Sequence, residues 1–183
     1  MEFENHEAFE KWLSGQSEEL RIAIASRAAL RAWPLIFKHE RWRSARSNEP
    51  AALLTVWALA GTAVSAFGPS AELRSQAISA RNACASYRNT NPFELGIRSA
   101  RVALEASVEA AAACAYYDLA AAASAAMAAK LVSGEHPETC HAVRLDTDFD
   151  SSEILLQPLW HDFSPPEGLR PEDIGETLLD TDP

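Results

Sequence analysis

The sequence predicts an all-α fold: an Ala-rich helical bundle of about five to six helices, followed by an acidic, Pro-rich, partly irregular C-terminal segment. Alanine, the best helix former, dominates the apolar residues, whereas Val, Ile, Phe and Tyr are scarce. The 183 residues are enough for one domain with a core and short for two. Six of the ten prolines follow Gly134, where we expect the regular helices to end.

The first two helices are predicted from apolar spacing and from a cap. Residues 3–13 carry aromatic and leucine side chains at helical spacing, and Gly15 is expected to end this short helix. Ser17 is a suitable N-cap for a second helix that runs towards Arg46. Pro34 lies within that helix and should kink or divide it, because proline removes an intrahelical hydrogen bond.

Three further helices complete the predicted bundle. Residues 51–67 are apolar nearly all round, and residues 70–88 are amphipathic. A capped start at Asn91 and Pro92 opens a helical stretch that reaches Val132. A straight helix of that length would span about 60 Å, so we expect a bend or break near residues 110–118. The Ala-rich middle is expected to lie at the centre of the bundle.

The negative charge is confined to the end of the chain. Eleven acidic residues and Arg170 alone stand in residues 146–183, which therefore carry the whole net charge of −10. Residues 1–145 are neutral. We predict a helical bundle over 1–145 and an acidic C-terminal segment over 146–183, docked on the bundle through residues 155–163. Short helices are possible within this segment at 151–157 and 171–179.

Three segments resemble an uncharacterised family of alanine-rich helical bacterial proteins. They are AIASRAALRAWPL, AAAACAYYDLAAAASAA and PLWHDFSPPEG, and together they touch about half of the chain. The resemblance implies an all-α fold and a bacterial cytoplasmic setting. It implies no activity, so it assigns no functional residue.

Composition also favours a cytoplasmic protein. The three cysteines, Cys84, Cys114 and Cys140, are widely spaced and odd in number, which fits a reducing compartment. The N-terminus has no basic, apolar signal-peptide pattern. The apolar run 51–67 reaches only the lower length limit for a membrane span, and a buried central helix explains it equally well.

An apolar and aromatic cluster in the acidic segment is the candidate partner-binding site. Such clusters dock into grooves, with tryptophan as a favoured anchor. The alternative, which we favour, is that the same side chains pack onto this protein's own bundle and complete its core. The residues are Leu156, Leu159, Trp160 and Phe163.

A basic stretch is the candidate nucleic-acid site. Arginines beside an aromatic side chain can hold phosphates and stack on bases. A solvated helix end explains the stretch better, since the overall charge has the wrong sign. A third interpretation has the acidic segment fold back over this basic stretch as an intramolecular clamp or nucleic-acid mimic. The residues are Lys38, Arg41, Arg43 and Arg46.

No motif predicts catalysis, a metal or a cofactor. His136, Cys140 and His141 lack a fourth ligand except by borrowing His161. The aspartates from Asp146 to Asp150 begin like a calcium loop but lack its glycine and its closing glutamate, so a capping and turn-forming role is expected. Glu105, Glu109 and Asp118 lack the Glu-x-x-His of di-metal bundles.

The sequence therefore favours a non-enzymatic protein-interaction or regulatory module, with another protein or a second copy of the chain as partner. A nucleic-acid-linked protein, with the acidic segment as competitor, is the alternative. A metal-dependent enzyme comes third.

Overall fold

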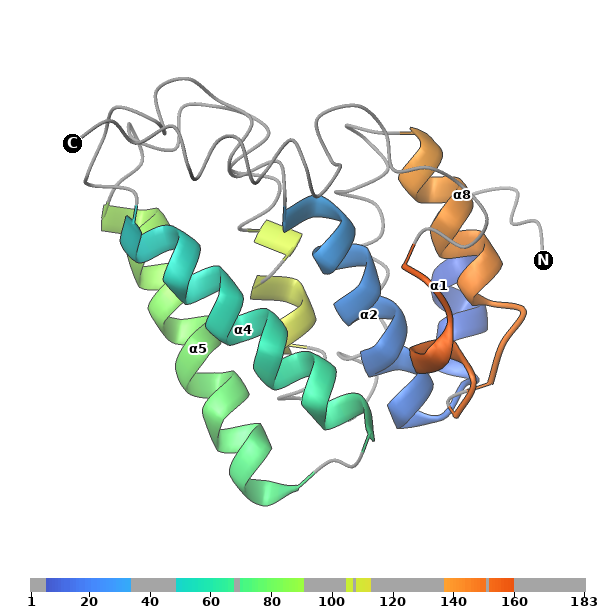
Figure 1. Cartoon of the computed structure of the whole chain (residues 1–183), viewed down its shortest axis with the longest axis horizontal. Helices are drawn as coiled ribbons and strands as arrows, with labels where there is room; N and C mark the ends of the chain where they lie inside the picture. The colour runs from blue at the N-terminus through green and yellow to red at the C-terminus, as the bar shows by residue number, and fades with distance from the viewer. Residues whose placement is uncertain are drawn as a thin grey trace.

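The computed structural model describes residues 6–33, 49–67, 70–90, 105–106, 108–112, 137–150 and 152–159, and these are helices and turns without a strand (Figure 1). The predicted all-α class is confirmed. The α-helices are α1 (His6–Ser14), α2 (Glu18–Ala32), α4 (Glu49–Phe67), α5 (Ala71–Thr90) and α8 (Pro137–Asp146), and η3 (Ile154–Leu156) is a 3-10 helix. Residues 105–106 and 108–112 are also helical.

The start of α2 follows the predicted cap. The backbone N–H of Gly15 donates to the Trp12 carbonyl at 3.1 Å and ends α1 in a tight turn. Ser17 then takes an extended backbone, and its hydroxyl accepts a hydrogen bond from the Leu20 N–H at 3.3 Å. The helix ends at Ala32, so the predicted continuation beyond Pro34 lies outside the described residues.

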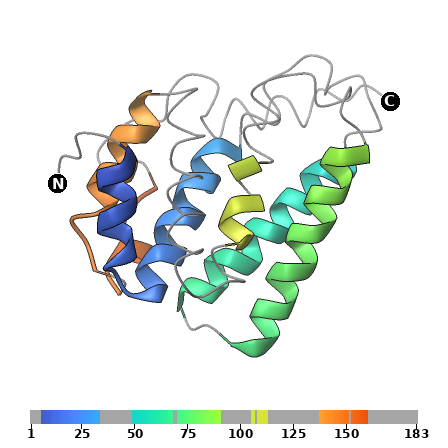
Figure 2. The same ribbon diagram turned by 180° about the vertical axis from the view of Figure 1, so that it is seen from behind.

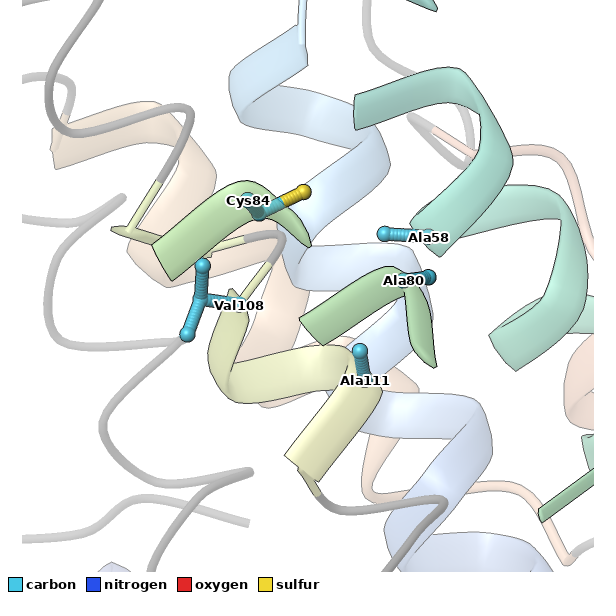
Figure 3. Packing of buried hydrophobic residues seen from close by; sticks show 5 residues of the cluster. All are labelled: Ala58, Ala80, Cys84, Val108 and Ala111. Carbon is cyan, nitrogen blue, oxygen red and sulfur yellow. The ribbon is translucent and has the colours of Figure 1, made fainter. Parts of the chain in front are cut away.

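Helices α4 and α5 form an antiparallel pair, and α2 packs against α4 (Figures 1 and 2). The Ser70 hydroxyl accepts from the Leu73 N–H at 3.2 Å and caps α5. A core cluster of mostly small side chains joins α4, α5 and the helical residues 108–112, and small side chains let helices approach closely (Figure 3). Its buried members are Ala58, Ala80, Cys84, Val108 and Ala111.

Helix α2 is the central helix of the described structure. Every residue from 22 to 29 is buried, and α2 contacts α4 as well as α8 and η3 (Figure 1). The interpretation of residues 51–67 as a buried central helix was wrong, because one face of α4 is exposed. The described part of the Ala-rich stretch, residues 108 and 110–112, is buried, and its predicted break near 110–118 lies largely outside the described residues.

The region after Gly134 is more helical than predicted. Helix α8 was not foreseen, and its last residue, Asp146, lies just beyond the predicted boundary at residue 145. The short helix expected within 151–157 is present as η3, whereas 171–179 lies outside the described residues.

Asp150 forms the turn that leads into η3, in agreement with the turn-forming role expected of these aspartates. Its carboxylate accepts from the Ser152 N–H at 2.8 Å, the Ser152 hydroxyl at 2.6 Å and the Glu153 N–H at 3.0 Å. These hydrogen bonds, above all the one from the Ser152 side chain, lower the pKa of Asp150.

The membrane interpretation of residues 51–67 finds no support in this structure. Among the described parts of the chain, no helix combines the length and the apolar character that a membrane span requires.

Candidate functional site

Helix α4 turns its small side chains inward and several large ones outward. Its buried positions are Thr55, Ala58, Leu59 and Thr62, which recur at helical spacing and face the rest of the bundle. The Thr62 hydroxyl stays on its own helix and donates to the Ala58 carbonyl at 2.6 Å. Only one of these four side chains is a large hydrophobe.

The outward face of α4 carries a row of exposed apolar side chains, which we call the α4 stripe. Leu53 is 65% exposed, Trp57 42% and Val64 53%. The stripe consists of Leu53, Val56, Trp57, Ala60 and Val64, all of them exposed. Scattered apolar residues are normal on a protein surface, but a contiguous apolar patch marks a contact site.

The side of α2 that faces α8 and η3 holds a buried ionic cluster. Arg27 and Arg31 are one turn apart on α2, so their side chains lie on the same face. Both reach the carboxylate of Asp146 at the end of α8. Arg27 donates through Nε at 3.0 Å, and Arg31 donates through Nη1 at 2.6 Å and Nη2 at 2.9 Å.

The same two arginines also hold the backbone that follows η3. Arg27 donates from Nη1 to the Gln157 carbonyl at 2.9 Å and from Nη2 to the Pro158 carbonyl at 2.7 Å. Arg31 donates from Nε to the Leu159 carbonyl at 2.8 Å. We call Arg27, Arg31, Asp146 and these three carbonyl groups the arginine clamp. It ties α2 to a segment more than a hundred residues later in the chain.

The clamp is withdrawn from water. Arg31 and Asp146 are both 0% exposed, and Arg27 is 5% exposed. Burial lowers the pKa of the Arg27 guanidinium, and the neighbouring Asp146 carboxylate opposes that shift. Two guanidinium groups share one carboxylate, so carbonyl dipoles supply the remaining acceptors. Arginine suits this role because its planar fork offers several donors in fixed directions.

The apolar contact beside the clamp is made by a residue that the sequence did not single out. Ile154 of η3 is fully buried, whereas Leu156, two residues later, is 78% exposed. For Leu156 the favoured interpretation, packing onto the bundle, was therefore wrong. Leu159 is half-buried, and its carbonyl is held by Arg31. As partner-binding residues, both stay a prediction.

The other predicted site residues lie outside the described residues. These are Trp160 and Phe163 of the apolar cluster, and Lys38, Arg41, Arg43 and Arg46 of the basic stretch. Two arginines earlier in the chain, Arg27 and Arg31 of α2, hold Asp146 and the backbone of residues 157–159. The predicted fold-back of the acidic segment concerned the basic stretch itself, so it stays a prediction.

The described residues offer no metal-binding cluster, and burial leaves Cys84 without activation as a nucleophile. They contain no group of three or more His, Cys, Asp or Glu side chains close enough to hold a metal ion. Glu105 and Glu109 are half-buried, while Asp118 and His136 lie outside the described residues. Burial raises the pKa of the Cys84 thiol to about 11, which keeps it protonated and a poor nucleophile at neutral pH.

The sequence contained a signal for both features. Arg27 and Arg31 are the charged residues of the otherwise uncharged run 22–32, where solvated arginines are unexpected. In α4 the signal was residue size rather than polarity. Leucine, tryptophan and valine recur on one face, opposite alanine and threonine.

Comparison of the chain with models of known protein families, with curated proteins and with solved structures finds no match. The functional argument therefore depends on the α4 stripe and the arginine clamp themselves.

Proposed function

We propose that this chain is a non-enzymatic protein-interaction module and that the α4 stripe is its contact surface. The observation that carries the proposal is the inverted order of side chains on α4. Three of its four buried positions hold the small residues Thr55, Ala58 and Thr62, beside Leu59, whereas the large side chains of Leu53 and Trp57 are exposed.

The energetic cost of this arrangement supports a second contact. A fully buried Val, Leu or Phe side chain contributes about 1.5–3 kcal/mol relative to an exposed one. Leu53, Val56, Trp57 and Val64 forgo much of that contribution while the stripe faces water. A partner that covered the stripe would recover it, and tryptophan is among the residues that most often dominate binding energy.

The neighbouring helices hold α4, and with it the stripe, in place. Helix α4 packs on α2 and α5, and α2 is held on its other side by α8, η3 and the arginine clamp. The stripe is thus presented by a helix with partners on its inner face. A pre-organised surface loses less conformational freedom on binding.

A photo-crosslinking amino acid at position 57 tests the proposal in cells of the native host. We expect a discrete protein adduct from position 57 and the same adduct from position 64. Gln76, exposed on α5, is the matched control position and should give none. The adduct should also disappear when Leu53→Asp is combined with the crosslinker at 57. Equal labelling from positions 57 and 76, or no protein adduct from 57, would contradict the proposal.

A further inference from the structure

We infer that the segment held by the arginine clamp is a latch, which leaves α2 as one unit while α2, α4 and α5 stay packed. The latch consists of α8, η3 and the backbone that follows η3, in the described residues 137–150 and 152–159. It lies on a different side of α2 from α4 (Figure 1), so the inference does not depend on the proposed function of the α4 stripe.

Helix α2 separates two groups of contacts. In both views it lies between the pair of α4 and α5 and the latch (Figures 1 and 2). Helices α4 and α5 pack on each other, and α4 packs on α2. Among the described elements, α8 and η3 make their most extensive contacts with α2. The latch can therefore separate from α2 without breaking the contacts that α4 makes with α2 and α5.

Polar atoms hold most of the latch. Its hydrogen bonds to Arg27 and Arg31 number three at the Asp146 carboxylate and three at backbone carbonyl groups. All of these groups form hydrogen bonds with water when the latch leaves, so the net loss is a small part of the strength of the bonds themselves. The buried apolar side chains among the described residues of the latch are Ala142, Val143 and Ile154.

Arg27 couples the two ends of the latch. Its Nε donates to Asp146 at the end of α8, while Nη1 and Nη2 donate to the carbonyl groups of Gln157 and Pro158 after η3. If one end left alone, a buried guanidinium would lose part of its acceptors, and a buried charge without compensation is strongly unfavourable. If both ends leave, water reaches every group at once. The fully bound and fully released states are therefore favoured over the states between them.

Hydrogen bonds inside the latch connect α8 to η3. The Thr147 N–H donates to the Arg144 carbonyl at 3.1 Å where α8 ends. The Ile154 N–H donates to the Asp150 carbonyl at 3.0 Å, and the Gln157 N–H donates to the Ile154 carbonyl at 3.3 Å. These turns do not involve α2, so they can persist when the latch leaves and keep its two ends together.

The other group of contacts is mainly apolar. Ala58, Cys84 and Val108 belong to the core cluster that joins α4, α5 and residues 108–112. Opening this cluster would expose apolar surface to water, which is unfavourable. Different regions of one protein can open with different free energies. We expect the latch to open at a lower free energy than the core cluster.

Thiol labelling at one buried position in each group tests the inference in the full-length chain. Cys84 reports on the core cluster, and Ala142→Cys, at a position that is 0% exposed, reports on the latch. Both chains carry Cys114→Ser and Cys140→Ser, and the latch reporter also carries Cys84→Ala. A buried thiol reacts only when its surroundings open. Its labelling rate, divided by the rate in the urea-unfolded chain, therefore measures the open fraction.

We expect the thiol at position 142 to react at least tenfold faster than Cys84. Its rate should also depend less steeply on urea, because release of the latch exposes less surface than unfolding does. Leu59→Ala, on the buried face of α4, should accelerate Cys84 at least tenfold and leave position 142 unchanged, because α4 stays packed when the latch leaves. Ile154→Ala is the matched variant within the latch and should accelerate position 142 at least tenfold.

Three results would overturn the inference: labelling at position 142 that is no faster than at Cys84, the same urea dependence at both positions, or equal acceleration of both by Leu59→Ala. The last two would mean that the described helices open as a single unit. If circular dichroism shows that Ala142→Cys alters the helical content, Thr147→Cys, at another buried position of the latch, takes its place.

Discussion

Replacing Asp146 by Asn should remove the counter-charge of the arginine clamp. The carboxylate is 0% exposed and accepts three hydrogen bonds from Arg27 and Arg31. Asparagine keeps the size of the side chain but replaces one acceptor oxygen by an NH2 group, which cannot accept from a guanidinium. Both arginines remain buried and lose the negative charge between them.

The expected loss is a large part of the total stability. Removing one partner of a buried ion pair costs about 3–5 kcal/mol, because the remaining charge stays buried without compensation. Whole domains are stable by about 5–15 kcal/mol. We expect Asp146→Asn to lower the free energy of unfolding by about 3–5 kcal/mol in urea titrations. Amide exchange should report the first opening at α8 and η3, since these elements reach α2 through the clamp.

The control removes the same charge from an exposed position. Glu153 lies in the same segment and is exposed, so Glu153→Gln should change the free energy of unfolding by no more than about 0.5 kcal/mol. If Asp146→Asn proved as mild as Glu153→Gln, the clamp would not hold the segment in the way its geometry indicates.

Two further predictions concern the core and the segment held by the clamp. Because the pKa of Cys84 is raised from 9.0 to about 11, the unfolded chain loses its thiol proton first as pH rises above 9. Stability should then fall by about 2–3 kcal/mol between pH 9 and pH 11; Cys84→Ala should remove this part of the pH dependence, and an identical pH profile in the variant would contradict the assignment. Ile154→Ala should cost about 2–5 kcal/mol because the side chain is fully buried, whereas Leu156→Ala should cost under about 0.5 kcal/mol. Comparable losses in the two variants would contradict the burial pattern of η3.

The two sides of α2 have different structural roles. On one side the clamp fixes α8 and the backbone of residues 157–159 within the same chain. On the other side α2 packs against α4, whose outer face is proposed to bind a protein partner. Variants of the clamp should then affect stability, while variants of the stripe should affect association and leave folding unchanged.

Local features of the sequence were sufficient to predict the class of the fold and several helix ends. Ser17 and Ser70 cap α2 and α5, and Gly15 ends α1, because capping and chain reversal depend on neighbouring residues. Helix α8 was missed because its local sequence does not resemble a helix. Proline, histidine and scattered acidic residues suggest a loop, yet Ala142 and Val143 are buried and stabilise a helix in this place.

Burial, in contrast, was decided by tertiary structure. The amino-acid sequence alone determined that residues 51–67 are apolar and uncharged, that Arg27 and Arg31 share a helix face, and that the acidic residues gather after Asp146. It could not determine that the charged helix α2 is central and that the apolar helix α4 lies at the surface. The reason is physical: a buried arginine is stable only beside its counter-charge, and Asp146 lies 115 residues beyond Arg31 in the chain. Likewise, only the packed bundle decides which face of an apolar helix is covered and which is left to meet a partner.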